Sequence, residues 1–242
     1  MYPTKICFVR SAYDLPTTYA NAWLAQVITY AKTKGYYVID LENPTKEEFE
    51  ETIQSQQPLL VIGSGHGESD VFAGKEREII LKKCTNDHLL ATKICYLIAC
   101  NTALELGPSA VNKGALAYIG WQEDFVFAIN AQYIERPTED PYAYAFFDTA
   151  NKIGYALLEG KTVKESYELA IQNFNKWIKY WRGVGDPMAQ QIITWLYWDR
   201  DNLIAITKEG LYTIPAPEMP YNLTPLIIMP AGLLAVHLIK KL

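Results

Sequence analysis

Two reactive side chains, His66 and Cys100, each follow a short apolar run of this chain. The run 59–62 ends at a glycine-rich turn that contains His66, and the run 94–99 ends at Cys100. A thiol is mostly protonated at neutral pH, because its ordinary pKa is about 8.5, and a neighbouring imidazole can accept its proton. The pair therefore predicts nucleophilic catalysis, with Cys100 as nucleophile and His66 as general base.

The two runs, and a third at 115–119, must position these side chains. Continuous apolar runs bounded by turn residues are typical of strands covered on both faces, and helical segments between them indicate a parallel sheet. Ligands collect at the carboxyl ends of such strands. We therefore predict a three-layer α/β/α sandwich with a mainly parallel sheet, in which His66 and Cys100 lie side by side at one edge.

The backbone around the pair adds two expectations. The glycines that flank His66 allow close approach to a substrate, and the N–H groups of Gly67 and Cys100 form a candidate oxyanion hole. Cys100 also precedes a predicted helix over 102–111, whose N-terminal dipole would favour the thiolate.

The order of these motifs resembles that of the caspase-like fold of cysteine endopeptidases, which includes caspases, metacaspases, gingipains, legumain, separase and CHAT domains. The likeness consists of a strand ending in His66-Gly67, a spacer, a strand ending in Ala99-Cys100 and a third strand. It covers 59–121 closely and 5–207 loosely, and the short spacer is closest to gingipains and CHAT domains. The resemblance implies a caspase-like sheet and a Cys-His dyad that hydrolyses peptide bonds.

One departure bears on specificity. Where caspases have Ser-Trp-Arg after the third strand, this chain has Gly120-Trp121-Gln122, so the arginine that helps caspases to bind aspartate is missing. Trp121 either forms a wall of the substrate pocket, as its counterpart does in caspases, or belongs to the core. Gln122 is a further candidate for contact with the substrate.

Four acidic residues stand near the two motifs: Glu68, Asp70, Glu123 and Asp124. They are either solvated charges or, as in gingipains, include one that pairs with a basic residue before the scissile bond. The expected function is that of a cysteine endopeptidase acting on protein or peptide substrates. The alternatives are an inactive caspase-like module for binding or assembly, a site that uses the same nucleophile on a small amide, and a scaffold tethered to a membrane by its C-terminal tail.

Composition limits partners and cofactors. A net charge of −5 gives no reason to expect a nucleic-acid partner. The four cysteines show neither C-x-x-C spacing nor a metal pattern, and no apolar leader begins the chain, so we expect a reduced, cytoplasmic protein with no metal and no cofactor.

Periodicity and capping predict the remaining elements. Helices are expected at 17–34, 46–54, 142–158, 163–181 and 188–197, and further strands at 5–9, 36–41 and 203–207. Thr45 with Glu48, and Thr162 with Glu165, fit capping boxes at two helix starts.

The C-terminal part differs from the rest. We predict a peptidase domain over 1–214 and a proline-rich segment over 215–242, in which Leu223 to Ile239 carries no charged residue. That stretch is either a marginal membrane anchor or an element that packs on the domain or on a partner subunit. The pattern does not determine the oligomeric state.

Overall fold

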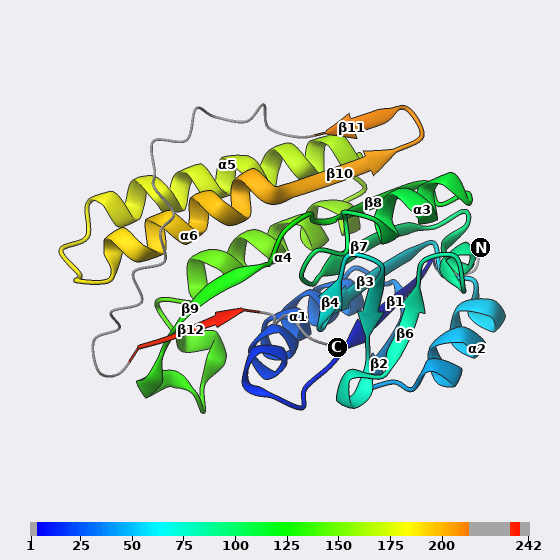
Figure 1. Ribbon diagram of the computed structural model, residues 1–242, viewed down its shortest axis with the longest axis horizontal. Coiled ribbons are helices and arrows are strands. Elements are labelled where there is room, and N and C mark those ends of the chain that lie inside the picture. Colours follow the sequence, from blue (N-terminus) through cyan, green and yellow to red (C-terminus); the bar gives the residue numbers. More distant parts are fainter. Residues whose placement is uncertain (1–3, 213–232, 238–242) are drawn as a thin grey trace.

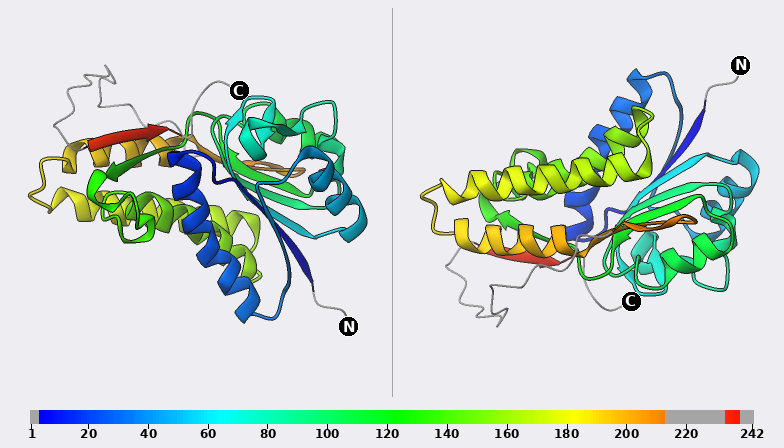
Figure 2. Two further views of the ribbon diagram at one scale, coloured as in Figure 1. Left: turned by 90° about the horizontal axis from the view of Figure 1, so that it is seen from below. Right: turned by 90° about the horizontal axis from the view of Figure 1, so that it is seen from above.

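The computed structural model describes residues 4–212 and 233–237. Within them a seven-stranded sheet has the order β11-β10-β8-β7-β3-β1-β2, with helices packed on both faces (Figures 1 and 2). The predicted three-layer α/β/α sandwich with a mainly parallel sheet is confirmed.

Strands and helices alternate along most of the described chain. The strands are β1 (Lys5–Arg10), β2 (Tyr37–Glu42), β3 (Leu60–Ser64), β4 (Gly67–Glu68), β5 (Val71–Ala73), β6 (Ile79–Lys82), β7 (Ile94–Ile98), β8 (Ala117–Trp121), β9 (Val126–Asn130), β10 (Leu203–Thr207), β11 (Gly210–Tyr212) and β12 (Leu233–His237). The α-helices are α1 (Leu15–Thr33), α2 (Lys46–Gln56), α3 (Leu106–Asn112), α4 (Tyr144–Leu158), α5 (Val163–Arg182) and α6 (Ala189–Asn202).

The parallel part of the sheet consists of β2, β1, β3, β7 and β8, and β10 runs antiparallel to β8. The chain leaves β1 for β2 on one side and returns to β3 on the other. Such a reversal opens a crevice at the carboxyl ends of the two strands, where open α/β sheets bind their ligands. The loops after β1 and β3 meet at this point.

Two apolar cores cover the two faces of the sheet. The first joins the sheet to α1, α4, α5 and α6 and is rich in aromatic rings, among them Trp121, Phe125, Phe127 and Phe147. The second joins it to α2, α3 and the small sheet of β4, β5 and β6. Alternation along each strand sends neighbouring residues to opposite cores.

Capping explains three helix starts. The predicted boxes at Thr45 with Glu48 and at Thr162 with Glu165 are confirmed. A third, not predicted, has Asp14 as N-cap, with its side chain accepting from the Thr17 backbone N–H. The first helix therefore begins at Leu15, before the apolar periodicity becomes visible.

Two sequence-based assignments are wrong. The helix expected from Thr102 begins at Leu106, because turns occupy the intervening residues, so Cys100 does not lie at a helix N-terminus. No strand was predicted within 122–141, where the structure has β9; it was missed because its apolar run is short and its partner strand lies far along the chain.

The predicted C-terminal segment is described only in part. Residues 233–237 form β12, which pairs antiparallel with β9, and the rest of 215–242 lies outside the described residues, as does most of the stretch Leu223 to Ile239. Among the helices of the described chain, none has the length and apolar character needed to cross a bilayer.

Candidate active site

Three neighbouring strands deliver three side chains to one edge of the sheet. Asp14 follows β1, His66 follows β3 and Cys100 follows β7, and β3 lies between the other two. The two parallel strands pair as far as Ser64 with Ile98, so His66 and Cys100 each stand two residues beyond the last pair. The backbone continues this pairing past β3, because the Gly65 N–H donates to the Ile98 carbonyl oxygen over 3.2 Å. The two strand ends therefore lie next to each other at one edge of the sheet, whereas the expected contact between the imidazole and the thiol stays a prediction.

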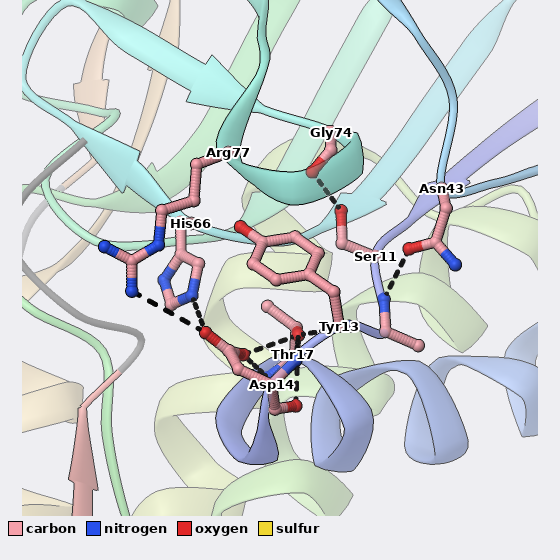
Figure 3. Close-up of polar contacts among 9 residues, drawn as sticks. Ser11, Tyr13, Asp14, Thr17, Asn43, His66, Gly74 and Arg77 are labelled. Carbon is pink, nitrogen blue, oxygen red and sulfur yellow. Dashed lines mark hydrogen bonds and ion pairs between the residues drawn. The ribbon is translucent and has the colours of Figure 1, made fainter.

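His66 is hydrogen-bonded to Asp14. The Nε2 atom of His66 lies 2.6 Å from Oδ2 of Asp14, and the imidazole is 1% exposed (Figure 3). Burial acts to raise the pKa of Asp14, but hydrogen bonds from His66 and Thr17 outweigh it and lower that pKa to about 2. An ionised carboxylate only accepts, so Nε2 donates its proton to Asp14, and in the neutral form of the ring the lone pair lies on Nδ1. Within the described chain this Nδ1 is buried and has no hydrogen-bond partner.

The loop after β1 fixes Asp14 from several sides. Oδ1 of Asp14 accepts from the Thr17 hydroxyl over 2.6 Å, so one carboxylate both caps α1 and orients the imidazole. The preceding residues are tied down as well, since the Ser11 hydroxyl donates to the Gly74 carbonyl oxygen and the Ala12 N–H donates to the Asn43 side chain.

A cation and an aromatic ring complete this side of the site. A nitrogen of Arg77 lies 3.9 Å from Oδ2 of Asp14, and the Tyr13 ring packs at 5.7 Å from the imidazole, centroid to centroid. Figure 3 shows Arg77 and His66 converging on the same carboxylate. Burial and the nearby Asp14 charge raise the pKa of Tyr13 to about 12, so its hydroxyl remains protonated at neutral pH.

Gly67 brings the turn against the Cys100 peptide. A Cβ atom added at Gly67 would lie 2.7 Å from the Cys100 carbonyl oxygen, 2.5 Å from the Thr102 methyl carbon and 3.2 Å from the Ala99 side chain. No other residue type allows this approach without displacement. The close approach is to the Cys100 peptide, so the expected approach to a substrate and the oxyanion role of the Gly67 and Cys100 amides both stay predictions.

The Cys100 thiol is fully buried. Its Sγ lies 4.0 Å from the Phe125 carbonyl oxygen, and the side chain belongs to the aromatic core. Burial first, and then the charge of Asp124, raise the pKa of Cys100 well above its ordinary value, and the buried Asp199 acts in the same direction. The expectation that a helix dipole would favour the thiolate is therefore wrong for this conformation, which holds a protonated thiol.

The turn after β8 is joined to the turn that carries Cys100. Asn101, in the left-handed region at φ 58°, donates from Nδ2 to Oδ1 of Asp124 over 2.6 Å. Its backbone N–H donates to the Glu123 carbonyl oxygen, and Nε1 of Trp198 donates to the Asp124 carbonyl oxygen. These bonds hold 123–125 against the thiol.

The predicted substrate-binding residues separate into three groups. Asp124 lies beside Cys100, and Glu123 next to it is exposed. Gln122 is half-buried and anchored to Asn202 through its backbone N–H. Glu68 and Asp70 are half-buried on the hairpin that follows His66.

Trp121 belongs to the core and not to a pocket wall. It is fully buried, its ring centroid lies 4.6 Å from that of Phe125, and its Nε1 donates to the Asp199 carbonyl oxygen over 2.9 Å. The pocket alternative is wrong, because strand alternation turns this side chain into the aromatic core.

Sequence reasoning missed Asp14, Arg77 and Asp199. Asp14 had a local signal, the spacing of a capping residue before Pro16 and Thr17, but that signal indicates a helix start and not a partner for His66. Asp199 and Arg77 reach the site only through long-range packing. No group of three or more potential metal ligands occurs within the described ranges.

No protein-family model and no curated protein matches this sequence.

Proposed function

We propose that the protein is a cysteine peptidase of the caspase-like type, with Cys100 as nucleophile, His66 as base and Asp14 as the residue that orients His66. The observation that carries the proposal is that His66 and Cys100 each follow two residues after the last pair of two adjacent parallel strands, while Nε2 of His66 is hydrogen-bonded to Asp14. An ionised orienting group, an imidazole and a thiol in that sequence form the constellation of acyl transfer.

The reaction would use each group in turn. Nδ1 of His66 accepts the thiol proton as Sγ of Cys100 attacks the scissile carbonyl carbon, and Asp14 stabilises the imidazolium that forms. The amides of Gly67 and Cys100 would donate to the oxyanion. The imidazolium then protonates the leaving amine, and water, activated by the same imidazole, hydrolyses the thioester.

The described conformation corresponds to a resting form. A buried thiol with a raised pKa can be neither reached nor readily ionised, so substrate binding must move residues 123–125 away from Cys100. The segment is held by hydrogen bonds to Asn101 and Trp198, and breaking them costs free energy that productive substrate contacts would supply.

A peptide acyloxymethyl ketone tests the assignment in a Cys84→Ser background, because Cys84 is exposed and would react independently. We expect a single label on Cys100, and loss of both label and peptide hydrolysis in Cys100→Ala and in His66→Ala. Labelling of Cys7 or Cys95 at the rate of Cys100 would contradict the proposal, since both are buried thiols away from this edge.

Specificity for a basic residue before the scissile bond is part of the proposal. Among the four acidic candidates, Asp124 is the one whose charge acts on the Cys100 thiol. Fluorogenic peptides that differ only at this position, with lysine, arginine, aspartate or leucine, would measure the preference as a ratio of kcat/KM values.

The burial of Cys100 favours one competing function, a non-catalytic module of the same fold that binds or assembles with a partner. Wild-type protein that neither cleaves a broad peptide library nor reacts with the ketone, while still binding an extended peptide, would support this function instead.

A further inference from the structure

Strand β9 has one edge closed by two carboxyl side chains. The Val126 N–H donates to Oδ1 of Asp199 over 2.9 Å, and the Asn130 N–H donates to Oδ2 of Asp140 over 2.8 Å. Both aspartates are fully buried. Because alternate residues of a strand direct their N–H groups to the same side, these two side chains occupy both ends of one edge of β9.

The other edge of β9 needs a strand. The N–H groups of Phe127 and Ile129 point away from the two aspartates, and both residues are fully buried. Buried backbone donors without a partner are costly, so an extended chain that pairs with this edge stabilises the fold. In the described structure β12 does so, with Leu234 opposite Ile129 and Val236 opposite Phe127 (Figure 1).

The direction of β12 relates this edge to the candidate nucleophile. The pairing is antiparallel, so the last residue of β12, His237, lies opposite Val126, the first residue of β9. Val126 follows Phe125, whose carbonyl oxygen is 4.0 Å from Sγ of Cys100. A chain bound here therefore runs from its N-terminal side toward the thiol, which is the direction required of the acyl side of a peptide substrate.

We infer that the edge of β9 opposite the two aspartates is a docking site for an extended peptide, and that β12 is its intramolecular occupant. The docking itself is independent of catalysis, whereas the view of β12 as a substrate-like occupant rests on the proposed function. Main-chain hydrogen bonds supply the affinity in such strand addition, so the site would accept a peptide in trans once β12 is displaced.

Two full-length variants test this inference. Leu234→Pro/Val236→Pro removes the two backbone N–H groups of β12 that face β9. The matched control, Ala235→Pro, removes an N–H group that points away from β9, and an edge strand tolerates proline at such a position. Both are made in a Cys100→Ala background, so that the outcome does not depend on peptidase activity. The probe is a fluorescent peptide with the sequence of residues 229–241, titrated by fluorescence anisotropy.

The peptide should bind the double-proline variant roughly a hundredfold more tightly than the parent chain or Ala235→Pro, because a tethered strand competes at an effective concentration on the order of millimolar. In hydrogen exchange, the amides of Phe127 and Ile129 should lose protection in the double variant and regain it with peptide. Equal binding to all three proteins, or no binding to the double variant, would overturn the inference.

A cross-link decides the matter if the double-proline variant does not fold. Ala128 and Ala235 lie directly opposite each other as a non-hydrogen-bonded pair of the two antiparallel strands. The Cα atoms of such pairs lie closest together, which suits a disulfide. In a Cys84→Ser background, Ala128→Cys/Ala235→Cys should form an intramolecular disulfide under mild oxidation. The control Ala128→Cys/Leu234→Cys, one residue out of register, should not. Equal cross-linking of the two variants, or none in the first, would refute occupation of this edge by β12.

Discussion

Asp14 accepts a hydrogen bond from His66 with one carboxylate oxygen, over 2.6 Å, and caps helix α1 with the other. The start of a helix and the orientation of the candidate base therefore depend on the same side chain. Because the loop after β1 is also bound to Gly74 and Asn43, the position of Asp14 is fixed before any substrate arrives.

Replacement of Asp14 should separate its two roles. Asp14→Asn keeps an oxygen for the cap but loses the charge that stabilises an imidazolium, so kcat/KM for a peptide substrate should fall by roughly 10²-fold or more. The melting temperature should fall by only about 2–4 °C, because the charge contributes on the order of 1 kcal/mol. Thr17→Val, which removes the hydroxyl that Asp14 accepts from, serves as the control for the cap, and an equal loss of activity there would contradict a special role for the charge.

The same carboxylate gives a pH dependence of stability. The folded-state pKa of about 2 lies below the ordinary value of 3.8, so the ionised form stabilises the fold above pH 3.8 and this contribution is lost as the pH falls toward about 2. Since the Asp14 side chain is 27% exposed, we expect on the order of 1 kcal/mol. Urea unfolding should show the difference between wild type and Asp14→Asn shrinking over that range, and a constant difference would exclude this linkage.

The charge of Asp124 should control the reactivity of Cys100. In a Cys84→Ser background, Asp124→Asn keeps an oxygen that can accept from Asn101 but removes a charge that, after burial, raises the pKa of the thiol. Alkylation by iodoacetamide should therefore become several-fold faster at alkaline pH, as measured by intact mass. Glu123→Gln, at the exposed neighbouring position, should leave the rate unchanged. Similar rates in the two variants would show that access alone limits the reaction.

Gly67 should be intolerant of a side chain. Gly67→Ala places a methyl group against the Cys100 carbonyl oxygen, a backbone atom that cannot move without shifting the nucleophile, so we expect about 1–3 kcal/mol of destabilisation and a loss of activity. Gly185→Ala is the matched control, since a Cβ there meets nothing within 4 Å. Chemical denaturation measures both, and a neutral Gly67→Ala would refute the close approach.

Asp199 should lower the free energy of unfolding as the pH rises. Burial raises its pKa well above 3.8, and its Oδ2 has no hydrogen-bond partner within the described chain. The native state then holds a proton that the unfolded state releases, so stability falls as the pH rises from 3.8 toward the folded-state pKa. Asp199→Asn, whose oxygen can still accept from Val126, should match wild type near pH 4 and become more stable by on the order of 1 kcal/mol at neutral pH. Exposed Glu168→Gln should show no such trend.

The sequence determined the local elements of this protein. The apolar runs, the capping residues at Thr45 and Thr162, and the turns after β3 and β7 are local features, so they predicted the sheet and the strand-end positions of His66 and Cys100 correctly. The start of the helix after Cys100 was predicted too early, because turns separate the end of β7 from the first residue of α3, Leu106.

Only the tertiary structure decided the environment of each side chain. The partnership of Asp14 with His66, the enclosure of Cys100 by residues 123–125 and the pairing of β9 with β12 all join segments far apart in the sequence. Burial and hydrogen bonding depend on which segments meet, and charges act on a thiol through space. The residue types and their order therefore indicated a chemistry, whereas the protonation and accessibility of the thiol followed from the packing around it.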